Sequence, residues 1–117
     1  MTHALKDSCR QMIVAVLAAN PRVERAVLFG SRAMGTNTVT SDVDIALFGE
    51  ALSLDDQARL AAEIEQLPIP QRVDLVRFHT ITQPDLRAHI TRDGIEWYRK
   101  GEHRPPSPAD TRQGTRK

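Results

Sequence analysis

The sequence predicts an α+β fold in which a small mixed β-sheet is covered by helices. Segments with apolar residues at helical spacing alternate with short apolar or alternating runs, in the order helix, strand, strand, helix, strand, helix. That order is typical of an α+β arrangement rather than a doubly wound one. The length of 117 residues suits about one domain, with a core that needs no disulfide or structural metal.

The first helix is expected over residues 4–19, where Asn20-Pro21 ends the pattern. The apolar residues that share its buried face are Leu5, Cys9, Met12, Ile13, Val16 and Leu17. A strand is expected to follow from Val23 to Phe29 and to end at Gly30. Beyond it, residues 31–35 could form a short helical turn, and residues 36–41 read as a polar loop.

Residues 42–48 predict a second strand because apolar and acidic side chains alternate there. The period of two places Asp42 and Asp44 on one face. The opposite, apolar face carries Val43, Ile45 and Leu47. That face fixes the register of the strand and therefore the direction of both acids.

The second half of the chain predicts two more helices and a strand between them. Ser53 and Asp56 resemble a capping box that opens a helix ending before Pro68, and a third strand is expected at residues 72–78. Thr82 is expected to cap a helix that begins near Pro84 and ends at Asp93-Gly94. Residues 95–98 could be a short strand or a last helical turn.

Composition excludes some kinds of site and indicates where in the cell the protein is expected. The only cysteine, Cys9, excludes an internal disulfide and a multi-cysteine zinc site, and a net charge of +1 gives no general attraction to nucleic acid or membrane. No basic leader or membrane-length apolar run is present, so we expect a cytoplasmic protein. Residues 1–100 are predicted to form the domain, and residues 101–117 a disordered, basic, proline-containing tail.

Gly30, Ser31 and Arg32 form a candidate phosphate-binding turn at the end of the first strand. Glycine lets the backbone approach a ligand closely, exposed amides attract an anion, and the serine and arginine side chains add donors. Alone, Gly-Ser is a common turn. A Walker loop is excluded because Thr36 stands where its lysine should be.

The acidic pair of the second strand is a candidate metal site. Two carboxylates on one face repel each other unless both are solvated or a cation lies between them. Mg²⁺ binds well through one or two carboxylates together with substrate phosphates. Asp42 and Asp44, close to a phosphate-binding turn, therefore suggest that a nucleoside triphosphate is held through magnesium.

Asp74 lies among apolar residues in what we interpret as an interior strand. If that strand lies beside the second one, three carboxylates converge. They could then hold two divalent ions about 4 Å apart, which would activate a hydroxyl and stabilise leaving pyrophosphate. The alternative for Asp74 is a salt bridge or a position on an edge strand. The four histidines show no mutual metal spacing and are interpreted as surface or loop residues: His3, His79, His89 and His103.

Taken together, residues 30–35 and 41–46 with Asp74 resemble the DNA polymerase beta nucleotidyltransferase superfamily, in its minimal nucleotidyltransferase (MNT) branch. The resemblance covers roughly residues 5–98. It implies that Asp42 and Asp44 bind both metals and that Asp74 binds the catalytic metal and helps deprotonate the nucleophile. It also implies that the Gly-Ser turn holds the triphosphate. Many MNT proteins are antitoxins paired with a HEPN-domain RNase toxin, and some transfer AMP from ATP to a toxin tyrosine.

The predicted function is Mg²⁺-dependent transfer of AMP from ATP to a hydroxyl of a partner HEPN toxin. After the sheet is built, few residues remain for an acceptor-binding domain, so a partner is expected to supply the acceptor. Two alternatives stay open: an antitoxin that neutralises its partner by binding alone, and a nucleotidyltransferase acting on a small molecule such as an aminoglycoside. Aromatic residues make up four per cent of the chain, which gives little support for direct nucleic-acid binding.

Overall fold

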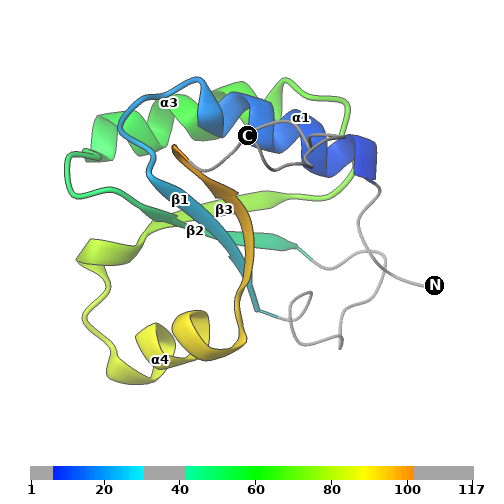
Figure 1. Ribbon diagram of the computed structural model, residues 1–117. Coiled ribbons are helices and arrows are strands. Elements are labelled where there is room, and N and C mark those ends of the chain that lie inside the picture. Colours follow the sequence, from blue (N-terminus) through cyan, green and yellow to red (C-terminus); the bar gives the residue numbers. More distant parts are fainter. Residues whose placement is uncertain (1–6, 31–41, 102–117) are drawn as a thin grey trace, which may run out of the picture.

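A four-stranded sheet in the order β3-β2-β1-β4 organises the computed structural model, which describes residues 7–30 and 42–101. Helices α1 and α3 cover one face of the sheet, and α4 covers the other (Figure 1). The elements are α1 Asp7–Ala18, β1 Arg25–Phe29, β2 Val43–Phe48, α3 Leu54–Glu65, β3 Val73–Arg77, the 3-10 turn η1 Phe78–Thr80, α4 Pro84–Asp93 and β4 Ile95–Arg99. The predicted α+β class is confirmed.

The sheet is mixed, as the sequence predicts. Strand β1 pairs in antiparallel fashion with both β2 and β4, whereas β2 and β3 run parallel. A parallel pair needs a crossover connection, and α3 supplies it. The strand at residues 72–78 therefore lies beside the one at 42–48, which was the condition for Asp74 to approach the acidic pair.

Strand β2 is covered on both faces, and this explains its nearly continuous apolar sequence. Val43, Ile45 and Leu47 are fully buried in the cluster formed with α1 and α3. Ala46 points the other way and packs with Ile90 of α4. Since side chains alternate along a strand, Asp44 lies on the α4 face of the sheet.

The two helices after β2 begin in different ways. The capping box at α3 is present: the Asp56 backbone N–H donates to the Ser53 hydroxyl, and the Ser53 backbone N–H donates to the Asp56 carboxylate. The expected cap at Thr82 is wrong, because α4 starts at Pro84 with Gln83 as N-cap and without a side-chain cap bond. Proline at the first position has its φ already set and carries no N–H that needs a partner.

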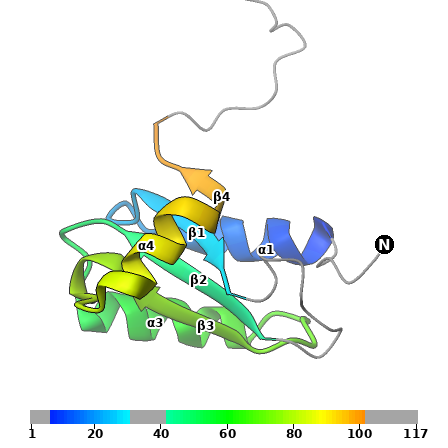
Figure 2. The same ribbon diagram turned by 90° about the horizontal axis from the view of Figure 1, so that it is seen from below.

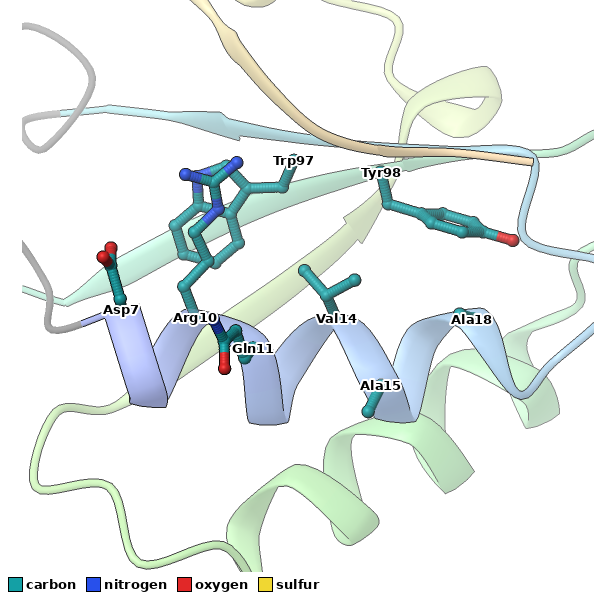
Figure 3. A pocket seen from close by; sticks show the side chains of 8 residues that line it. All are labelled: Asp7, Arg10, Gln11, Val14, Ala15, Ala18, Trp97 and Tyr98. Carbon is teal, nitrogen blue, oxygen red and sulfur yellow. The ribbon is translucent and has the colours of Figure 1, made fainter. Parts of the chain in front are cut away.

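The last segment is a strand, which resolves the alternatives left open for residues 95–98. Strand β4 contains a bulge: Tyr98 pairs with Ala26 and Glu96 with Val27, so Trp97 is the extra residue. The bulge lets Trp97 and Tyr98 both face α1 (Figure 3). The predicted short turn at residues 31–35, the loop at 36–41 and the tail from 102 onward lie outside the described residues.

Candidate active site

Asp44 and Asp74 are direct partners in the parallel pairing of β2 and β3. In-register partners on adjacent strands point to the same face, which here is the face covered by α4. On the other side of β2, Asp44 pairs with Phe29, the last residue of β1, and Gly30 follows immediately. The structure therefore brings together Gly30, Asp44 and Asp74, although the first and the last are 44 positions apart in the sequence.

The charge of Asp44 is unfavourable in this setting. Burial raises the pKa of the Asp44 carboxyl, and the negative charges of Asp74 and Asp42 raise this pKa further. Asp42 itself is exposed, just before β2 begins. Asp44 thus lies within electrostatic reach of two other carboxylates, and a bound cation would relieve that repulsion.

Asp74 does not lie in an interior strand, and that interpretation is wrong. Strand β3 forms one edge of the described sheet, and the Asp74 side chain is 41% exposed. It forms an ion pair with Arg72, whose Nε lies 3.2 Å from the Asp74 Oδ1. The apolar neighbours of Asp74 suggested an interior strand because β3 is packed on both faces. Val73 contacts the core on the α1 and α3 side, and Val76 contacts the core on the α4 side.

The donor set fits magnesium bound together with substrate, although no protein cage is complete. Among residues 7–30 and 42–101, no three His, Cys, Asp or Glu side chains are arranged as a metal site. Mg²⁺ is ordinarily held by one or two carboxylates, substrate phosphates and water, and it prefers oxygen ligands. Two facing carboxylates beside a glycine turn match that pattern, and Arg72 provides the positive charge next to Asp74.

Gly30 occupies a position that other residues would fill poorly. Its φ is +84°, in the left-handed region that favours glycine. A Cβ at this position would lie 2.6 Å from Oδ2 of Asp44. The absence of a side chain therefore leaves room for the carboxylate beside the backbone. Ser31 and Arg32, the other predicted nucleotide-binding residues, lie outside the described part of the chain.

His89 was missed as a site residue, because its interpretation as a surface or loop histidine depended on spacing alone. It lies on α4, is half-buried, and accepts a hydrogen bond from the Gly30 backbone N–H at 3.1 Å. Its Nδ1 lies 3.2 Å from the Asp93 carboxylate one helical turn further on. The spacing of His89 and Asp93 by four residues was the available signal, since such pairs share one face of a helix.

A separate groove of about 530 Å³ lies between α1 and β4 (Figure 3). Its walls include Val14 and Trp97, with the Arg10 guanidinium stacked 5.5 Å from the centre of the Trp97 ring. The groove is on the α1 face of the sheet, whereas the carboxylates are on the face that α4 covers. Figure 2 views the sheet from the α4 side, with α4 in front of the strands. The groove is therefore not part of the candidate active site.

Comparison with known proteins points to one enzyme family. The pattern of the family described as polymerase beta nucleotidyltransferases matches residues 11–103. A relative from Methanocaldococcus jannaschii, named "Putative protein adenylyltransferase MJ0435", is 37% identical over 91 residues, which span 77% of this chain and 95% of that protein.

Solved structures agree with the fold. A crystal structure described as a toxin-antitoxin with AMP-PNP is 26% identical, with a TM-score of 0.65 over 79% of this chain and 74% of that one. The MNT antitoxin complexed with a tri-AMPylated HEPN toxin of Shewanella oneidensis shares the fold at 22% identity, with a TM-score of 0.60 over 78% and 70% of the two chains.

No helix among the described residues is long and apolar enough to cross a membrane.

Proposed function

The chain belongs to the polymerase beta nucleotidyltransferase family, and on this basis we propose that it transfers AMP from ATP to a hydroxyl group of a partner protein, with Mg²⁺. The observation that carries the proposal is the in-register pair Asp44 and Asp74 beside the glycine turn. This pair of carboxylates supplies oxygen ligands next to a turn where the backbone can approach a phosphate group. The relative from M. jannaschii, named as a protein adenylyltransferase, supports a protein as the acceptor.

Each predicted residue has a role in this reaction. Gly30 lets the backbone approach the triphosphate closely, and Ser31 and Arg32 hold it through backbone and side-chain donors. Asp42, Asp44 and Asp74 hold divalent cations, two of which would offset the phosphate charge and orient the reacting oxygens when bound.

The chemistry is a substitution at the α-phosphorus of ATP. The acceptor oxygen forms a bond to that phosphorus as the bond to the β-phosphate oxygen breaks, and pyrophosphate leaves. Asp74, which is partly exposed at the sheet edge, takes up the proton of the acceptor hydroxyl. The protein otherwise contributes positioning and electrostatics, which is most of what such transfers require.

The proposed acceptor is a tyrosine hydroxyl of a HEPN-domain RNase toxin, which this chain would neutralise in the cytoplasm. The family resemblance implies that partner class. The similarity to a toxin-antitoxin structure containing AMP-PNP supports both a toxin partner and an adenine nucleotide. Strand β3 is an edge strand of the sheet formed by the described residues, and the partial exposure of Asp74 there gives a separate protein a route to the site.

Labelled ATP tests the proposal directly. The protein would be incubated with α-labelled ATP, Mg²⁺ and the product of the neighbouring gene as the candidate partner. We expect the label on that product, and no label when Mg²⁺ is chelated or when Asp44 is replaced by Ala. Glu50→Gln, at an exposed acid in the turn after β2, serves as the control and should label normally.

A growth-rescue assay separates catalysis from binding. If Asp44→Ala still rescues cells from the toxin, neutralisation occurs by binding and the enzymatic proposal is wrong. Labelling of a small hydroxyl compound without any partner protein would also contradict the proposed acceptor.

A further inference from the structure

The backbone N–H of Gly30 is already used within the protein. It donates to Nε2 of His89, 3.1 Å away on α4, rather than pointing freely toward a ligand. The two residues are 59 positions apart in sequence. This hydrogen bond therefore ties the end of β1, where the chain enters the proposed nucleotide-binding turn, to a helix on the α4 face of the sheet.

The geometry fixes the state of the histidine ring. Since the Gly30 N–H is a donor, Nε2 must carry a lone pair, so the ring is neutral and its proton is on Nδ1. That proton is donated to Oδ2 of Asp93, 3.2 Å away. Hydrogen bonds from Arg92 and then from His89 lower the pKa of Asp93, so the carboxylate stays ionised as an acceptor.

The ring is also held in place by packing. The Phe29 ring meets it edge to face, with 6.2 Å between the ring centres and 74° between the planes. The next residue on α4, Ile90, is 2% exposed and is buried against the sheet. The helix therefore has little freedom to move the histidine away from the glycine.

We propose that His89 is a positioning residue of the nucleotide site: its Nε2 holds the Gly30 amide, and thereby fixes the backbone at the end of β1 beside the Asp44 carboxylate. This inference rests on the proposed function and adds a residue outside the motif that suggested it. A second consequence is that the Gly30 amide is not a phosphate donor. Binding of the triphosphate then depends on groups other than this amide.

Substitutions at position 89 test the role of the acceptor nitrogen. His89→Phe keeps a ring of similar size but removes the acceptor, whereas a glutamine amide oxygen can accept near the position of Nε2. His79, an exposed histidine in η1, offers the matched control His79→Phe. Asp93→Ala removes the acceptor that fixes the tautomer and tests the same arrangement independently of the ring.

The measurement is equilibrium binding of fluorescent AMP-PNP with Mg²⁺, together with thermal unfolding of each variant. We expect His89→Phe to bind about tenfold more weakly, as for loss of one hydrogen bond that preorganises the site. The affinity of His89→Gln for AMP-PNP should be within about threefold of the wild-type affinity. The affinity of Asp93→Ala should lie between those of His89→Phe and His89→Gln. His79→Phe should bind as wild type does.

Rescue by glutamine separates positioning from a merely structural role. The inference requires that the affinity for AMP-PNP depends on a hydrogen-bond acceptor at position 89 and does not simply vary with the melting temperature of the variant. Wild-type affinity in His89→Phe, or equal weakness in His89→Gln and His89→Phe, would overturn the inference alone. Absence of nucleotide binding by the folded wild-type protein would overturn the proposed function and the inference together. Should His89→Phe fail to fold, His89→Gln and Asp93→Ala still decide the question.

Discussion

Asp44 and Asp74 face each other across the only parallel strand pair among the described strands, and burial and the charge of Asp74 together raise the pKa of Asp44. A carboxyl whose pKa is higher in the folded than in the unfolded state binds its proton more tightly when folded. Its ionisation therefore lowers the free energy of unfolding as pH rises through the two pKa values. At neutral pH the negative charge on Asp44 works against folding.

Asp44→Asn should therefore raise the melting temperature at pH 7 in the absence of divalent cations. It should also lower AMP transfer by about a hundredfold, because it removes a carboxylate that we propose to bind metal. Differential scanning fluorimetry, first with EDTA and then with Mg²⁺ and ATP, compares the melting temperatures of the variant and the wild-type protein. Glu50→Gln removes one negative charge at an exposed site and controls for net charge. A melting temperature for Asp44→Asn below that of the control would contradict the electrostatic interpretation.

Replacing Gly30 by Ala should both destabilise the protein and weaken the site. The left-handed backbone costs an alanine about 1–2 kcal/mol, and the new Cβ would meet the Asp44 carboxylate. Gly101→Ala is a matched control, because Gly101 has a φ of +86° but no atom within 4 Å of the place that a Cβ would occupy. Chemical denaturation should show a larger decrease in the free energy of unfolding for Gly30→Ala than for Gly101→Ala. Equal losses would mean that the contact with Asp44 is relaxed at no cost.

Arg72 forms an ion pair with Asp74, and it would therefore compete with a metal ion for the carboxylate that we propose as a ligand. The ion pair is exposed, so its loss should change binding only modestly, by at most about fivefold, corresponding to about 1 kcal/mol. Arg72→Gln is expected to lower the Mg²⁺ concentration that gives half-maximal transfer. A higher Mg²⁺ requirement in the variant would show instead that Arg72 assists binding. Arg59, which pairs with Asp55 on α3, provides the control Arg59→Gln.

Acid should weaken the start of α3 through Asp56. The Ser53 backbone N–H lowers the pKa of Asp56 from its usual 3.8 most strongly, followed by the Ser53 hydroxyl and the Arg22 ion pair, in spite of burial. A depressed folded pKa contributes stability that is present above about pH 4 and is lost as pH falls through the folded value. Melting temperatures between pH 7 and 2 should fall less steeply for Asp56→Asn than for wild type.

Ser53→Ala separates the cap from the charge at this helix start. It should cost about 1 kcal/mol at pH 7, as expected for loss of a helix cap. Most of the acid dependence should remain, because the backbone N–H of Ser53 still donates to Asp56. An unchanged pH profile in Asp56→Asn would exclude this carboxyl as a source of acid sensitivity.

Local signals in the sequence predicted most of the fold. The capping box at Ser53 and the alternation from Asp42 to Phe48 are short-range patterns, and both appear as expected. Residues 95–99 were ambiguous because five residues are too few to distinguish a strand from a helical turn. Pairing with β1 decides between them, and that pairing joins residues about 70 positions apart.

The site was only partly predictable for the same reason. Asp42 and Asp44 share a face by strand geometry alone, but the approach of Asp74 depended on which strands are neighbours. The edge position of β3 was hidden because helices and loops cover both of its faces. His89 could not be connected to Gly30 from spacing, since the contact is made only when α4 folds back onto β1.

The bulge at Trp97 has a consequence for self-association of the protein. Strand β4 is the outer strand opposite β3 in the part of the chain that the structure describes. An exposed, regular outer strand is a template on which other chains can add and aggregate. An extra residue interrupts the even repeat of backbone donors and acceptors and twists the strand. The irregularity that turns two aromatic rings inward thus also protects this edge against fibril-like growth.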